Sequence, residues 1–252
     1  MRTLLALLLT CWACLADNIT NLYVGQEVYV GMPLTTVYAV EEVPSGFVLV
    51  GATNFVVSEN TTNDIAIPGS LVEGDLVIVA WANDVPQGAT EGVLTTGYIA
   101  FGDYRANSGP SCAIAYKVMS ETPDASVSVS AITTKSSGVV QVWRGQNATV
   151  LDVAVASQTG NPGMPNPKPI TPVTEGALML AVGWLDDDDC ADVTAPSGYS
   201  NLTFGNTGAG GDVGSTTMIA SKEWASGEED PGAFGGTGDD AWNTAVIAIR
   251  PQ

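Results

Sequence analysis

Histidine is missing from this chain, and basic residues are scarce. None of the 252 residues is histidine, and eight Lys and Arg stand against 27 Asp and Glu, which gives a formal charge of −19. Without imidazole, neither a Ser–His–Asp nor a Cys–His nucleophile system can form, and zinc sites that need imidazole are excluded too. The negative balance argues against nucleic acid as a partner, because phosphate binding needs a basic surface. We therefore expect no enzymatic activity and no bound cofactor.

Charged residues of both signs make up only 14% of the chain, whereas hydrophobic residues make up 45% and glycine and proline contribute 28 and 14 residues. No segment carries a sustained helical period with capping residues. Short runs of β-branched and aliphatic residues between Gly, Pro, Asp or Ser are typical of buried strands joined by turns. The composition predicts an all-β protein.

The first sixteen residues have the pattern of a secretory signal peptide. Arg2 precedes an apolar, leucine-rich stretch that ends at Ala16, and Asp17 follows. The stretch is too short for a membrane span, which needs about 20 residues. We expect residues 1–16 to be a signal peptide, the chain to be secreted, and no membrane-spanning segment.

Three stretches recur in the same order at nearly constant spacing, which indicates an internal duplication. The matches lie 102, 105 and about 106 residues apart. They pair residues 73–81 with 175–184, 112–117 with 217–222, and 139–145 with 245–251. Further strands are expected at residues 65–67, 97–101, 125–132, 150–156 and 199–204.

We predict that residues 51–252 form one jelly-roll-like antiparallel β-sandwich, with pseudo-repeats at about 51–160 and 161–252. Residues 17–50 lie outside the duplication and are strand-like and rich in Tyr and Val. Such an extra segment has two fates: it pairs with its own sheet edge, or it pairs with the edge of a neighbouring subunit.

The acidic run 186–189 is the densest set of hard oxygen ligands in the sequence. Asp186, Asp188 and Asp189 are candidate ligands for Ca²⁺, which binds six to eight oxygens. The alternative is a solvated loop at the end of a strand, since no EF-hand pattern follows.

In an oxidising compartment, Cys112 and Cys190 are candidates for a disulfide, and two separate buried thiols are the alternative. Four sequons are candidate glycosylation sites. They begin at Asn18, Asn60, Asn147 and Asn201.

Several short segments resemble a recurrent pattern of β-sandwich proteins from the tail fibres and virion surfaces of tailed bacteriophages. They are residues 74–79, 115–118, 142–145, 196–199 and 248–251. The resemblance covers roughly residues 60–252 and implies a non-enzymatic structural or adhesive role. A signal peptide and an added N-terminal strand segment both depart from that pattern, so the chain looks like an exported relative.

These features predict a secreted structural subunit that self-assembles through β-strand pairing into an extracellular filament or surface appendage. The alternative is a carbohydrate-binding adhesin, at a virion or a cell surface, whose partners are glycans.

Overall fold

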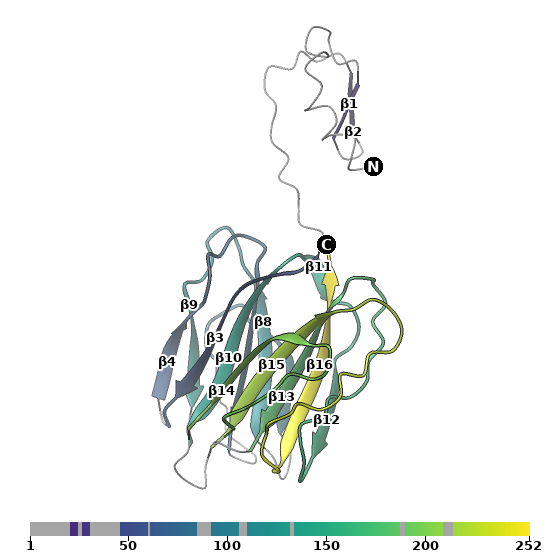
Figure 1. Ribbon diagram of the computed structural model, residues 1–252. Helices are drawn as coiled ribbons and strands as arrows, with labels where there is room; N and C mark the ends of the chain where they lie inside the picture. Colours follow the sequence, from purple (N-terminus) through teal and green to yellow (C-terminus); the bar gives the residue numbers. More distant parts are fainter. Residues whose placement is uncertain are drawn as a thin grey trace. The chain divides into compact units, whose positions relative to one another are not determined.

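The computed structural model describes residues 21–24, 27–30, 46–59, 61–84, 92–105, 110–131, 134–186, 190–208 and 214–252. These residues form strands and connecting turns without any helix, which confirms the all-β prediction (Figure 1). The strands are β1 (Asn21–Val24), β2 (Glu27–Val30), β3 (Val48–Val57), β4 (Thr61–Ala66), β5 (Leu76–Asn83), β6 (Gly92–Val93), β7 (Ile99–Arg105), β8 (Ser111–Val118), β9 (Ser126–Ala131), β10 (Ser136–Arg144), β11 (Gln146–Leu151), β12 (Ala156–Gly160), β13 (Leu178–Leu185), β14 (Ser200–Asn206), β15 (Thr216–Glu223) and β16 (Trp242–Pro251).

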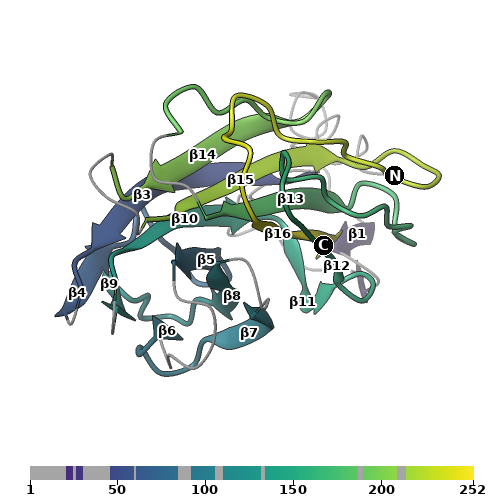
Figure 2. The ribbon, with the colours of Figure 1, turned by 90° about the horizontal axis from the view of Figure 1, so that it is seen from below.

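Two antiparallel sheets make the predicted sandwich. The first sheet has the strand order β3-β10-β5-β8-β7, and the second has the order β11-β16-β13-β15-β14, with β12 also paired to β16. A third, three-stranded sheet, β4-β9-β6, which we call the cover sheet, supplies hydrophobic residues to a cluster on the outer face of the first sheet. Seen from one end of the strands, the first and second sheets lie face to face (Figure 2).

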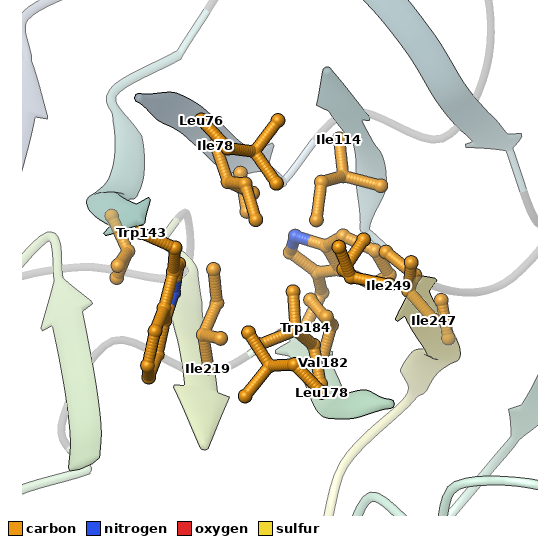
Figure 3. Packing of buried hydrophobic residues seen from close by; sticks show 14 of the residues in the cluster. Leu76, Ile78, Ile114, Trp143, Leu178, Val182, Trp184, Ile219, Ile247 and Ile249 are labelled. Atoms are coloured by element: carbon orange, nitrogen blue, oxygen red, sulfur yellow. The ribbon is translucent and has the colours of Figure 1, made fainter. Parts of the chain in front are cut away.

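The central core lies between the first and second sheets. Leu76, Ile78 and Ile114 from the first sheet point toward side chains of the second sheet such as Val182 and Trp184 (Figure 3). All five are completely buried. Burial of each large aliphatic side chain contributes about 1.5–3 kcal/mol, so this interface is the main source of stability for the fold.

Strands β5 and β13 are buried along their whole length because both faces of each sheet are covered. Their alternate residues contribute to the central core on one face and to an outer cluster on the other. The cover sheet packs on the outer face of the first sheet, whereas segments between the strands, including Ile170, Cys190 and Phe234, cover the second. This double burial explains why these strands read as unbroken apolar runs rather than as alternating ones.

The duplication extends to the register of the strands. β5 pairs with β8 so that Leu76 faces Val118, and β13 pairs with β15 so that Leu178 faces Glu223. On the other side, Leu76 faces Trp143 of β10, as Leu178 faces Ile249 of β16. The spacings found in the sequence therefore connect residues in the same place in the two sheets.

Two details of the sequence interpretation were wrong. The match of residues 73–81 with 175–184 suggests that the tryptophans ending the two stretches, Trp81 and Trp184, are equivalent, but Trp81 lies in the outer cluster of the first sheet and Trp184 in the central core. In a strand, a shift of one residue moves a side chain to the opposite face. Residues 150–156 are also not one strand: β11 ends at Leu151 and β12 begins at Ala156, because Asp152 turns its carboxylate to the backbone N–H groups of residues 173 and 174.

The N-terminal part of the chain is a unit of its own. Residues Met1–Val43 separate from the sandwich unit Pro44–Gln252, and β3 already begins at Val48, inside the segment 17–50 of the sequence interpretation. Within the described part of this unit, β1 pairs with β2 in antiparallel register and with no other strand. The predicted signal peptide, residues 1–16, lies outside the described residues.

Candidate functional site

Of the three predicted calcium ligands, the structure describes only Asp186. Asp188 and Asp189 lie outside the described residues. Asp186 directly follows β13, and its backbone N–H donates to the carbonyl of Ala241 at 2.9 Å. Among the residues that the structure describes, no three Asp, Glu or Cys gather in a way that would hold a metal ion. The calcium site remains a prediction.

The prediction of a disulfide between Cys112 and Cys190 is corrected by the structure, which does not join the two residues. Cys112 is buried in the central core, where its thiol donates to the carbonyl oxygen of Tyr104 at 3.5 Å. Cys190 is buried in the outer cluster of the second sheet. The second sheet lies between these two clusters, so the side chains of Cys112 and Cys190 lie on opposite sides of it. This arrangement agrees with the alternative of two separate buried thiols.

Two of the four sequons fall on described strands. Asn147 on β11 is half-buried, and its Oδ1 accepts a hydrogen bond from the backbone N–H of Thr149 at 3.1 Å. Asn201 on β14 is exposed, but its Nδ2, the atom that would carry a glycan, donates to Ser221 Oγ at 2.9 Å. Asn18 and Asn60 lie outside the described residues.

Two arginines at equivalent positions, near the ends of β10 and β16, each pair with a buried carboxylate. Arg144 donates from Nε to Asp75 at 2.7 Å, and this contact raises the pKa of Arg144. Arg250, the equivalent residue, donates from Nε to Asp152 at 3.3 Å. Burial alone would raise the pKa of Asp152, but hydrogen bonds from Thr174 Oγ1, two backbone N–H groups and Arg250 outweigh it and lower that pKa below its ordinary value.

A second set of charged residues is also duplicated, on the outer faces of the sheets. Lys117 Nζ lies 2.6 Å from Asp124 and 5.8 Å from the centre of the Tyr98 ring. In the second repeat Lys222 Nζ lies 2.9 Å from Glu229 and 5.8 Å from the centre of the Tyr199 ring. Burial, and then the neighbouring carboxylates, raise the pKa of both tyrosines. The same arrangement thus occurs once in each repeat.

Where β3 and β14 meet, the two sheets are closely joined. Asn54 Nδ2 donates to the carbonyl of Phe204 at 2.8 Å, and Gly205 lies directly against the backbone of Gly138, with no room for a side chain. A shallow cavity of about 340 Å³ beside this contact is lined by backbone and side chains of Asn54–Val56 and Phe204–Asn206. None of these lining residues carries a titratable side chain.

The opposite edge of the first sheet leaves apolar side chains exposed. Ile99 on β7 faces Tyr116 on β8, and the ring of Tyr116 stacks on that of Phe101 at 4.2 Å between centroids. Val118 lies two residues further along β8 and hence on the same face. Ile99 is 56% exposed and Val118 is 39% exposed. We call Ile99, Phe101, Tyr116 and Val118 the β7–β8 edge patch; β7 is the outermost strand here (Figure 2).

The second repeat is polar at the positions that correspond to Ile99, Tyr116 and Val118. Ser200 faces Ser221 in the register in which Ile99 faces Tyr116, and Glu223 stands where the first repeat has Val118. Ser221 is almost completely buried. The sequence analysis missed the β7–β8 edge patch, although a residue-by-residue comparison of the two repeats would have revealed this difference.

Comparison of the chain with protein-family models, with curated proteins and with solved structures returns no match. In the part of the chain that the structure describes, no helix has the length and apolar character needed to cross a bilayer.

Proposed function

We propose that this protein is a secreted structural subunit that self-assembles into an extracellular filament or surface appendage, with its N-terminal strands pairing to a neighbouring copy. The observation that carries the proposal is the separate N-terminal unit, in which β1 and β2, four residues each, pair only with each other among the described residues. An isolated two-stranded hairpin is marginally stable in water, so it gains most by adding to another sheet.

The sandwich unit supports a structural role in two ways. Its interior is filled by aliphatic and aromatic side chains from both sheets. Its four described ion pairs all join residues of the same sandwich unit: the two lysine–carboxylate pairs are duplicated, and the two arginines occupy equivalent positions with different carboxylate partners. These groups stabilise the fold rather than form a reactive site.

A carbohydrate-binding adhesin is the alternative function, and the described residues favour it less. Sugar platforms are usually built from exposed aromatic rings, and tryptophan is the strongest of these. The five described tryptophans are at most 8% exposed: Trp81, Trp143, Trp184, Trp224 and Trp242.

The test is to produce the chain from residue 17 onward and to follow its assembly by sedimentation and negative-stain electron microscopy. We expect linear polymers, and we expect a variant without residues 17–43 to remain monomeric and folded. Polymers that form equally well without residues 17–43 would exclude the N-terminal strands as the connecting element. A wild-type chain that stays monomeric at all concentrations and salt conditions would overturn the proposed function, and binding on a glycan array would then favour the adhesin.

A further inference from the structure

We propose that the β7–β8 edge patch of the sandwich is the surface that accepts the N-terminal strands of a second copy of this chain. The inference rests on the proposed function and names the partner surface that assembly would use. The donor is the strand region of residues 17–43 of the neighbouring copy, which adds alongside β7.

The first argument is the exposure of the patch. An outermost strand presents unpaired backbone N–H and C=O groups, and exposed apolar side chains beside it make it a template for another strand. Ile99 and Val118 flank Tyr116 on the face of the first sheet that forms the central core, yet both remain exposed to solvent. A strand added next to β7 would cover Ile99 and would extend the core past Phe101.

The second argument comes from comparison of the sheet edges. At the edge related to β7 by the duplication, β14 is joined to β10: Gln141 Nε2 donates to the carbonyl of Asn201 and to Thr203 Oγ1, both at 3.1 Å. At the far side of the second sheet, β12 presents Ser157, Gln158 and Thr159, all exposed and polar. Polar edge strands discourage the addition of another strand, so of the three edges compared β7 is the one suited to an apolar donor.

The third argument is the composition of the donor. Three of the seven tyrosines of the chain lie in residues 17–43, at positions 23, 29 and 38, among valines and leucines. Tyrosine is enriched at protein interfaces, because its ring buries a large area while its hydroxyl stays hydrated. The segment thus has apolar side chains that could pack on the exposed Ile99 and Val118 and on the half-buried Tyr116 between them.

The first experiment replaces residues of the patch by those of the second repeat in the full chain from residue 17. Ile99→Ser and Val118→Glu should each raise the critical concentration of assembly about tenfold or more, because burial of one aliphatic side chain is worth about 1.5–3 kcal/mol. The matched control is Met164→Glu, since Met164 is 52% exposed at a distant place in the sequence. It should assemble like the wild type, and circular dichroism should show the same fold for all three variants.

The second experiment places cysteines at the expected contact. Ile99→Cys is combined in one chain with a cysteine at Leu22, Tyr23 or Val24, and the three double variants are oxidised. Because side chains alternate along a strand, we expect inter-chain crosslinks from alternate positions, seen as a ladder of dimers and higher species on non-reducing gels. Crosslinks confined within single chains, or none from any of the three positions, would overturn the proposal.

The outcomes separate this proposal from the proposed function. If wild-type polymers form and depend on residues 17–43, but Ile99→Ser and Val118→Glu polymerise normally, the filament role stands and the β7–β8 edge patch is not the acceptor. If both variants are impaired and Met164→Glu is not, the acceptor is identified. If the wild type never polymerises, both proposals fail.

Discussion

Replacement of Asp152 by asparagine should destabilise the sandwich in a way that depends on pH. The carboxylate of Asp152 is fully buried and accepts hydrogen bonds from Val173 N, Thr174 N, Thr174 Oγ1 and Arg250 Nε. An asparagine keeps one acceptor oxygen, which can serve the two backbone N–H groups, but its NH₂ group then points at the guanidinium of Arg250. A hydrogen bond to a charged group is worth about 1.5–3 kcal/mol.

Solvent reduces this cost, because the Arg250 side chain is 33% exposed and water can hydrate its charge. We therefore expect Asp152→Asn to lower the free energy of unfolding by about 2 kcal/mol at pH 7. For a domain of this size the melting temperature falls by about 2–4 °C per kcal/mol, so the expected decrease is about 4–8 °C.

The pH dependence follows from the lowered pKa of Asp152 in the folded state. The unfolded chain takes up a proton at the ordinary carboxyl pKa of 3.8, while the folded chain resists protonation until lower pH. The stabilisation is thus fully present above about pH 5 and is lost as the pH falls from there through the folded-state pKa. Asp152→Asn has no proton to bind, so its deficit relative to the wild type should shrink toward zero in acid.

The assay is urea unfolding of both proteins at several pH values between 2 and 7. Asp124→Asn is the control, because the Lys117–Asp124 pair is partly exposed and should contribute less than about 1 kcal/mol. A deficit of Asp152→Asn that stays constant from pH 7 to pH 2, or a variant as stable as the wild type at pH 7, would refute the reasoning.

Three further predictions concern charge, packing and thiols. Assembly should improve as salt or a divalent cation is added, since copies with a formal charge of −19 repel one another, and sedimentation that decreases with salt would contradict this. Gly138→Ala should lower the free energy of unfolding by about 1–3 kcal/mol, because the ring of Phe55 lies directly over the glycine. In a chain that already carries Phe55→Ala, the same change should lower it little, and a double-mutant cycle of urea unfolding measures the difference. Cys112 and Cys190 are buried, so they should react with a thiol reagent only after unfolding, whether or not the protein is first reduced. A number of reactive thiols that rises only after reduction would instead support the predicted disulfide.

The sequence was sufficient to predict the strands and the duplication because both are local patterns. Apolar runs bounded by Gly, Pro or Asp mark β5, β10, β13 and β16, and the glycines at 74 and 176 have positive φ angles that suit the turns before β5 and β13. Repetition of these runs at constant spacing predicted two equivalent sheets. The register of the strands then confirmed that equivalence.

Features that depend on contacts between distant segments were not predictable in the same way. The break at Asp152 depends on backbone groups of residues 173 and 174, about 20 positions away. The separation of Cys112 from Cys190 depends on which face of the second sheet each occupies, and spacing along the chain does not encode this. The exposure of Ile99 similarly depends on which residues of the second sheet pack over the edge strand β7, and this is not encoded in the local sequence.

The difference between the two repeats has a consequence for the form of the assembly. If both repeats carried an apolar edge, each copy would offer two acceptor surfaces for its single N-terminal segment, and chains could branch. Ser200, Ser221 and Glu223 stand at the corresponding positions of the second repeat, so under the proposed assembly each copy would have one donor and one acceptor. A donor on one copy that meets a different surface on the next is a heterologous contact, which produces an open linear polymer unless the rotation between copies closes a ring. If the chain assembles as proposed, the polar residues of the second repeat are as necessary for a filament as the apolar residues of the first.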